Sequence, residues 1–138
     1  MPYNKHYFNN YLEYYADNIT PRLENIDVYV KSGEDAFPVH EVSALLALTD
    51  KEVSDIMRDK HIATLDKSNF FEIMQSGSSP LCKLYKRELD RQSPYIYAPD
   101  DIAYIYELDA NDVRQVCDEL SLKHITASLL PLIFSKIT

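Results

Sequence analysis

The stretch that decides the fold is PVHEVSALLALTDKEVSDIMRDKHI, residues 38–62, in which apolar side chains recur at intervals of three and four. This spacing places apolar side chains on one face of a helix, and the polar residues between them on the other face. A break in the pattern divides the stretch into two parts. We therefore predict a helix over 41–46, a turn over 47–49 and a second helix over 50–60.

A second stretch, PDDIAYIYELDANDVRQVCDELSL at residues 99–122, has the same order of apolar and polar residues. The two stretches align without a gap at an offset of 60 residues, as Val42 and Ile102 show (102 − 42 = 60). A duplicated helical unit is the economical explanation, and a chance match of two amphipathic helices is the alternative. The matching apolar pairs are Val42/Ile102, Leu45/Ile105, Leu46/Tyr106, Leu48/Leu108, Val53/Val113, Ile56/Val116, Met57/Cys117 and Ile62/Leu122.

The second copy predicts helices over 100–106 and 110–120, again separated by a turn. Each copy has a short polar residue where its second helix begins: Thr49 or Asp50 in the first copy, and Asp109 in the second. Such side chains accept hydrogen bonds from the free N–H groups of a first helical turn. We expect these residues to cap the second helices.

Both copies resemble the helix-turn-helix of DNA-binding regulators, with a small residue, Ser43 or Ala103, after the first apolar position. Residues 66–74, DKSNFFEIM, look like the tail helix that closes excisionase-type and MerR-type winged domains. The resemblance covers residues 38–75 and, more weakly, 98–134. It implies that the second helix of a unit enters the major groove of DNA.

The chain departs from this family pattern in two places. Ala47 and Glu107 stand where the family has a turn glycine, at a position that can require a positive φ angle. The basic wing of the family is shortened here to HIATL, residues 61–65. The usual phosphate contacts of the wing are therefore not carried over to this chain.

We predict a mainly α fold with two tandem helix-turn-helix-like units and minor β strands or vestigial wings. The strands are expected at 26–31, where apolar and polar residues alternate, and at 61–65. The predicted segments are a tyrosine-rich N-terminal helix and short strand at 1–37, the first unit at 38–80, a connecting helix at 81–97 and the second unit at 98–138.

Tyrosines spaced by three and four residues predict a helix over 3–18, which Pro21 should prevent from continuing past Thr20. We expect the tyrosine rings to pack on their own domain, with each hydroxyl reaching solvent. The alternative is that this helix forms a contact with another subunit, because tyrosine is enriched in interface cores.

The chain has 138 residues, of which 14 are basic and 22 acidic, so its formal net charge is −8. This charge opposes non-specific attraction to nucleic acid but leaves room for a local basic patch. The N-terminus has no apolar segment of the secretory type, and no apolar run is long enough for a membrane span. We expect a cytoplasmic protein without a membrane partner.

The leading hypothesis is a small non-enzymatic regulator that binds DNA through its first unit. Lys51, Ser54 and Arg58 lie on the outward side of the predicted second helix and are suited to contact bases and phosphates. The second unit is a poor candidate, because residues 98–122 hold seven acidic side chains against Arg114 alone.

A further basic cluster, Lys83, Lys86 and Arg87, shares one face of the predicted connecting helix. A solvated helix surface explains this cluster well, and a phosphate-contacting helix is the functional alternative. The cluster could also attract the acidic half of the same molecule.

The rival hypothesis is an acidic protein–protein interaction module that kept the fold without binding DNA, conceivably as a nucleic-acid mimic. Asp112, Asp118 and Glu119 would then hold a basic protein, or the second unit would form a homodimer. The two hypotheses are nearly equal on the sequence alone.

We expect no enzyme, no cofactor and no metal site. The four histidines are scattered, and Cys82 and Cys117 form no CxxC pair. Cys117 and His124 could share a helical face as nucleophile and base. However, Cys117 occupies the apolar position that matches Met57, so a buried structural thiol is expected.

Overall fold

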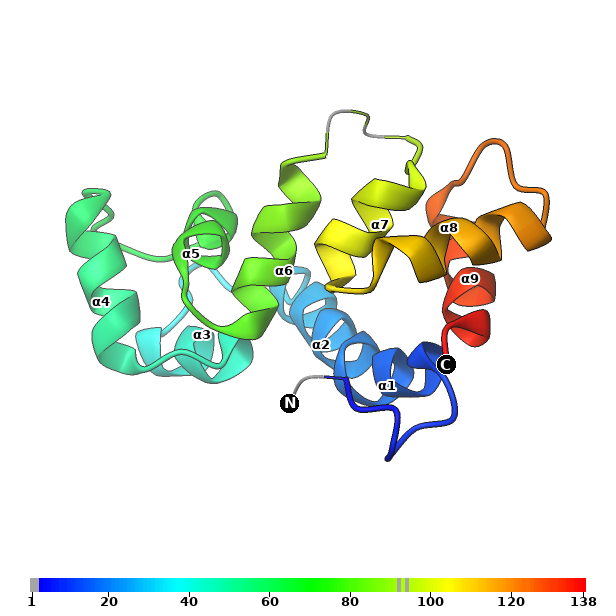
Figure 1. Ribbon diagram of the computed structural model, residues 1–138. Helices are drawn as coiled ribbons and strands as arrows, with labels where there is room; N and C mark the ends of the chain where they lie inside the picture. The colour runs from blue at the N-terminus through cyan, green and yellow to red at the C-terminus, as the bar shows by residue number, and fades with distance from the viewer. Residues whose placement is uncertain (1–2, 92, 94) are drawn as a thin grey trace. The chain divides into compact units, whose positions relative to one another are not determined.

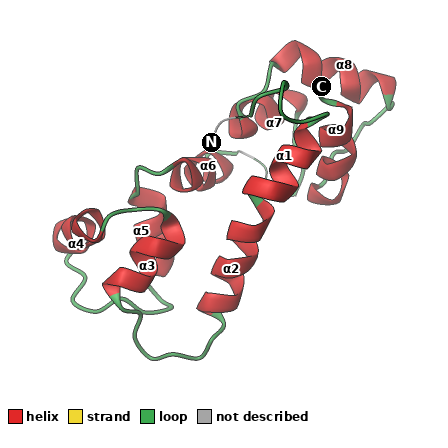
Figure 2. Cartoon of the chain, turned by 90° about the horizontal axis from the view of Figure 1, so that it is seen from below, coloured by secondary structure: helices red, strands yellow, loops and turns green. Residues whose placement is uncertain are grey.

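The computed structural model describes residues 3–91, 93 and 95–138, and the regular structure of this part is helical (Figure 1). The predicted mainly α fold is confirmed, and Figure 2 shows the helices joined by loops. The helices are α1 (Tyr11–Asn18), α2 (Thr20–Val30), α3 (Val39–Leu46), α4 (Asp50–Asp59), α5 (Phe70–Ser76), α6 (Pro80–Leu89), α7 (Pro99–Tyr106), α8 (Ala110–Glu119), the 3-10 helix Ala127–Leu129 and α9 (Leu130–Lys136).

The chain divides into two compact units. The middle unit is Pro21–Lys86, and the terminal unit joins the residues up to Thr20 to those from Arg87 onward. One boundary falls at the start of α2 and the other within α6, so α6 contributes residues to both units. Each unit contains one of the two repeated stretches.

A left-handed backbone conformation follows the first helix of each repeated stretch. Ala47 after α3 has φ 57° and ψ 44°, and Glu107 after α7 has φ 56° and ψ 46°. The next N–H then points back at the helix: Leu48 and Leu108 each donate to the carbonyl five residues earlier, both at 2.9 Å. This reversal ends the first helix and starts the chain towards the second.

The second helices begin at the caps that the sequence predicts. The Thr49 hydroxyl accepts a hydrogen bond of 3.1 Å from the N–H of Glu52. The Asp109 carboxylate accepts from the N–H groups of Asn111 and Asp112 at 2.8 and 3.1 Å. These bonds satisfy N–H groups that have no partner within the helix, so the cap assignments to Thr49 and Asp109 are confirmed.

A backbone hydrogen bond closes each copy on itself at matching positions. The N–H of Phe37 donates to the carbonyl of Leu65 at 2.8 Å, and the N–H of Tyr97 donates to that of Ile125 at 2.7 Å. Both donors and both acceptors are 60 residues apart (97 − 37 and 125 − 65). The two copies therefore match in backbone geometry well beyond the helical pair itself.

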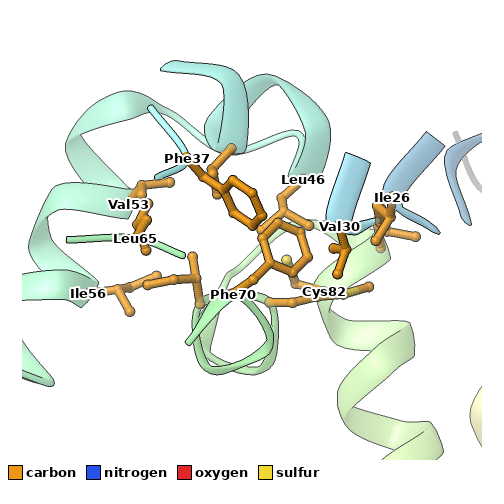
Figure 3. Packing of buried hydrophobic residues seen from close by; sticks show 13 residues of the cluster. Ile26, Val30, Phe37, Leu46, Val53, Ile56, Leu65, Phe70 and Cys82 are labelled. Carbon is orange, nitrogen blue, oxygen red and sulfur yellow. The ribbon is translucent and has the colours of Figure 1, made fainter. Parts of the chain in front are cut away.

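The core of the middle unit forms between α3, α4 and α5, with α2 and α6 adding further apolar side chains (Figure 3). Phe37 and Phe70 meet edge to face near its centre, with ring centroids 6.1 Å apart. Of the predicted inward residues of the first copy, Val42, Leu46, Val53 and Ile56 are buried, and Leu45, Leu48, Met57 and Ile62 are partly buried against the core. The core residues are Ile26, Val30, Phe37, Val42, Leu46, Val53, Ile56, Leu65, Phe70, Ile73, Met74, Leu81 and Cys82.

The terminal unit buries the counterparts of several of these residues. Ile102 and Val113 have no exposed surface, as is also true of Val42 and Val53 in the first copy. Ile133 and Phe134 of α9 are likewise fully buried. Burial of apolar surface is the main stabilising contribution to a fold of this kind, and the apolar pattern shared by the two copies places it at equivalent positions.

Helix α1 packs against the terminal unit that contains it. Tyr11 is buried, its ring centroid lies 4.7 Å from that of Phe134, and its N–H donates to the carbonyl of Ile137 at 2.8 Å. The Tyr15 ring also contacts Tyr106, with centroids 5.9 Å apart. Tyr11 and Tyr15 therefore pack on their own unit, as the preferred sequence interpretation expects, whereas Tyr7 is 75% exposed and the Tyr3 hydroxyl is buried and not in solvent.

The predicted strand at 26–31 is wrong, because these residues belong to α2 and the turn after it. Ile26 and Val30 are both buried, a spacing that suits one face of a helix as well as a strand. Val28, which a strand would also bury, is 70% exposed. An ion pair of 2.9 Å between Asp27 and Lys31 has the (i, i+4) spacing that stabilises helices.

The predicted helix over 3–18 is too long, because regular helix begins at Tyr11. Asn10 has extended backbone angles, and its side chain accepts a hydrogen bond of 3.0 Å from the N–H of Glu13. Asparagine favours such a cap over a helix interior. At the other end, Pro21 lies in the first turn of α2, where a missing N–H costs little.

The predicted strand at 61–65 is also wrong for the described residues, where β pairing is limited to the isolated bridge between Tyr97 and Ile125. His61 has φ 57°, which interrupts any extended run at its first residue. The side chain of Leu65 is buried in the core, so the loop at 61–65 packs against the helices of the middle unit.

The predicted connecting helix at 81–97 is shorter than expected, since α6 ends at Leu89. Leu81 is buried, whereas Leu89, two turns later on the same face, is 49% exposed. The burial of apolar side chains that stabilises α6 therefore does not extend to Leu89, where the helix ends. Residues 92 and 94 of the predicted segment lie outside the described residues.

Replacing Ala47 by glycine should stabilise the protein. A residue with a Cβ is strained at φ 57°, and glycine removes this strain, so we expect a gain of about 0.5–1 kcal/mol in the free energy of unfolding. The matched control is Ala44→Gly in the interior of α3, which should destabilise by a similar amount. Urea denaturation of both variants measures this, and a loss of stability in Ala47→Gly would contradict the assigned turn.

Candidate nucleic-acid interface

The outward face of α4 carries the residues that the sequence predicts for DNA contact. Val53 and Ile56 turn the other face of this helix into the core. Lys51, Ser54 and Arg58 are exposed, and their spacing of three and four residues places them along one row. The structure therefore brings these three side chains to one solvent-facing surface of the middle unit.

Both cations of this row are paired with the same carboxylate. Lys51 Nζ lies 2.8 Å from Asp55 Oδ2, and Arg58 Nη2 lies 3.0 Å from Asp55 Oδ1. Arg58 Nε also lies 3.9 Å from a carboxylate oxygen of Asp59. The hydrogen bond from Lys51, together with the charges of Lys51 and Arg58, lowers the pKa of Asp55. Asp55 is therefore ionised at neutral pH and holds both cations on the helix surface.

A polar contact braces α4 against α3. The buried Ser43 hydroxyl donates to the Asp50 carboxylate, and His40 Nδ1 lies 3.3 Å from the other carboxylate oxygen. These hydrogen bonds, first that of Ser43 and then that of His40, lower the pKa of Asp50. In the second copy, Arg114 Nη2 lies 2.9 Å from Asp100 and links α8 to α7. Each helical pair is thus fixed by different side chains.

Glu52 of α4 is engaged away from the predicted DNA-contact row. Its two carboxylate oxygens accept hydrogen bonds from the N–H and the hydroxyl of Ser78, both at 2.8 Å. The neighbouring Ser79 hydroxyl donates to the carbonyl of Leu46 at 2.7 Å. Glu52 therefore anchors the segment that leads into α6, a role that its sequence position alone does not reveal.

The second basic cluster is divided by the structure. Lys83 and Lys86 are exposed on the part of α6 that belongs to the middle unit. The Arg87 side chain is only 18% exposed; its Nε donates to the carbonyl of Ile105 at 2.8 Å, and its Nη1 lies 3.3 Å from Glu107. Arg87 thereby caps the C-terminal end of α7 and holds the residue with positive φ.

The predicted partner-binding residues lie on the surface of α8. Asp112, Asp118 and Glu119 are exposed, and no ion pair among the described residues involves them. Glu119 accepts a hydrogen bond of 3.1 Å from the side chain of Gln115. The cation of this helix, Arg114, is occupied by Asp100. The outward surface of α8 is therefore acidic.

Two exposed cations near α4 were not singled out from the sequence. Lys60 follows the last residue of α4, and Lys67 lies in the loop before α5. Their counterparts in the second copy are Leu120 and Ala127, at the offset of 60 residues (120 − 60 and 127 − 67). Extending the comparison of the two copies past the second helix would have revealed this difference.

Cys117 lies in α8, which ends at Glu119, so His124 is not on the same helix. Burial raises the pKa of the Cys82 and Cys117 thiols, and both side chains are inside their units. The described residues contain no group of three or more histidine, cysteine or acidic side chains that could hold a metal ion. Within the same part of the chain, no helix is long and apolar enough to cross a membrane.

The contrast between Arg87 and Lys86 gives a stability test. Arg87→Ala removes a charge-assisted hydrogen bond to a helix end, so we expect it to lower the free energy of unfolding by about 1–3 kcal/mol. Lys86→Ala removes the same charge from an exposed neighbour and should change stability by less than about 0.5 kcal/mol. Thermal and urea denaturation compare the two, and equal effects would contradict the capping role of Arg87.

No protein family, curated protein or solved structure matches the chain.

Proposed function

We propose that the protein is a non-enzymatic regulator that binds DNA through the helical pair α3–α4 of its middle unit. In this proposal the two copies are tandem helix-turn-helix units, resembling those of excisionase-type and MerR-type regulators. α4 enters the major groove and presents Lys51, Ser54 and Arg58. The observation that carries the proposal is the exposed row of these three side chains opposite the buried face of α4.

The second copy supplies an internal comparison that supports this assignment. The first copy has exposed cations at four places on α4 and the following loop where the second copy has none. The first-copy cations and their second-copy counterparts are Lys51/Asn111, Arg58/Asp118, Lys60/Leu120 and Lys67/Ala127. Since the backbone angles and hydrogen bonds of the copies match, the difference between them is chemical. Arg114 and Lys123 of the second copy are also exposed, at positions where the first copy has Ser54 and Ala63, and Arg114 is paired with Asp100. The first copy therefore offers phosphate the larger set of positive partners.

The chemistry of the row fits the two tasks of a DNA-binding helix. Arginine and lysine contact phosphates and the acceptor atoms of guanine, and a serine hydroxyl can bond to several base edges. Lys83 and Lys86 of α6 are further candidates for phosphate contact, since both are exposed. The loop at 61–65 stands in place of a wing and contributes less than a basic wing would.

The existing ion pairs of α4 do not block this function. Lys51 and Arg58 have side chains that are 85% and 72% exposed, and ion pairs in such positions contribute about 0–1 kcal/mol. Replacing the carboxylate partner with phosphate therefore costs little. Because the middle unit carries 8 basic and 11 acidic residues (8 − 11 = −3), binding depends on this local arrangement and not on net charge.

The proposal predicts that the protein retards random duplex DNA at low salt and that affinity falls steeply as salt rises. In the double variant Lys51→Ala/Arg58→Ala, each lost phosphate contact should reduce the slope of log affinity against log salt by about 0.9. The matched control is Lys123→Ala/Lys136→Ala, which removes two exposed cations from the terminal unit and should leave the slope unchanged.

An absence of retardation by the wild-type protein at low ionic strength and micromolar protein would exclude DNA binding. An equal loss of affinity in the two double variants would mean that net charge, and not the α4 row, determines the interaction. Circular dichroism of each variant verifies that its helices are retained.

The acidic surface of α8 supports a second candidate function, a protein–protein interaction module. Asp112, Asp118 and Glu119 are exposed and unused in ion pairs among the described residues. The terminal unit has 6 basic and 11 acidic residues (6 − 11 = −5), so a basic partner is the one that its charge favours. The partner would be a basic protein. In the alternative form of this hypothesis, two copies of the chain form a homodimer.

This second function predicts that immobilised protein retains a lysine-rich peptide at moderate salt. The triple variant Asp112→Asn/Asp118→Asn/Glu119→Gln should lose most of this retention, because it removes three exposed negative charges of α8. The control triple variant Glu34→Gln/Asp35→Asn/Glu72→Gln neutralises three exposed acids of the middle unit and should retain the peptide. Unchanged retention in the first variant would count against a binding role for α8.

A further inference from the structure

We propose that Asp55 is a specificity-determining residue, whose carboxylate restrains Lys51 and Arg58 and disfavours binding to DNA of arbitrary sequence. This inference rests on the proposed DNA-binding function of α4. It assigns a role to an acidic residue that stands in the middle of an otherwise basic and polar row.

Asp55 lies between Lys51 and Arg58 on α4. It lies four residues after Lys51 and three before Arg58, within 2.8 and 3.0 Å of their nitrogen atoms. Its side chain is 34% exposed, much less than those of the two cations. The carboxylate therefore lies at the base of the row, and the cations extend past it into solvent.

The negative charge of Asp55 affects which DNA sequences α4 can bind. When Lys51 and Arg58 turn to phosphate, the carboxylate stays behind on the same face of the helix. A negative charge left close to DNA opposes binding unless it gains a partner of its own. The amino group of cytosine is such a partner, because it donates a hydrogen bond to a carboxylate in the major groove. DNA with cytosine at this position is then favoured over other sequences.

The second copy shows that the fold does not require an acidic residue at the position of Asp55. Gln115 occupies the matching position on α8 (115 − 55 = 60), and its amide donates to Glu119 at 3.1 Å. Val116 beside it is buried as Ile56 is in the first copy. An uncharged amide thus fits this site of the helical pair without changing its packing.

The test compares Asp55→Asn with Asp59→Asn by titrating random-sequence duplex DNA over a salt series. Both variants add one unit of positive net charge to the same helix, but Asp59 lies 3.9 Å from Arg58 and does not bridge the two cations. For Asp55→Asn we expect affinity for random duplex to rise about fivefold, with the salt slope unchanged because Lys51 and Arg58 contact phosphate in both proteins. For Asp59→Asn we expect less than about half of this rise in affinity. Asp55→Glu keeps the charge and should behave as the wild type.

A selection from a random-sequence pool supplies the readout that a structural role would not move. The wild-type protein should enrich one position for cytosine, and Asp55→Asn should lose that preference while still binding. Equal behaviour of Asp55→Asn and Asp59→Asn, with DNA binding intact in the wild type, would overturn the role of Asp55 and leave the proposed function standing. No binding by the wild-type protein would overturn both.

Discussion

Ala47 and Glu107 adopt a left-handed backbone conformation directly after a helix, and the arrangement of both units depends on it. At this conformation the following N–H bonds back to the helix, which fixes where the next helix starts. The second helix can then turn its apolar residues onto the first, as Val53 does in one copy and Val113 in the other. Neither turn residue is glycine, so packing must compensate for the strain at both positions.

The sequence predicted the parts of the fold that local chemistry determines. The caps at Thr49 and Asp109 follow from residue type and spacing, and both were found. Of the predicted apolar pairs, Val42/Ile102, Val53/Val113 and Ile56/Val116 are buried in both copies, and the other pairs have at least one half-buried member. The predicted strand at 26–31 was wrong. Burial of Ile26 and Val30 is compatible with a helix and with a strand, and only the exposure of Val28 distinguishes the helix from the strand. The start of α1 was missed because the tyrosine spacing outweighed the capping signal of Asn10.

The sequence predicted correctly the exposure of those candidate residues whose side chains point away from the protein. Lys51, Ser54 and Arg58 are exposed because the buried residues of α4 leave them no other side. Arg87 has the same charge and a similar helical position, yet it caps α7 through a carbonyl 18 residues away in sequence. Such long-range hydrogen bonds, and that of Glu52 with Ser78, depend on tertiary packing that periodicity cannot supply.

The most direct measurement of the central claim is the sign of φ at the turn residues in solution. One-bond Cα–Hα couplings and amide chemical shifts from NMR report this sign residue by residue. We predict positive φ at Ala47 and Glu107, and also at His61 and Ser121, which occupy matching positions after α4 and α8. Negative φ at Ala47 or Glu107, as in a helix that continues without a turn, would contradict this prediction.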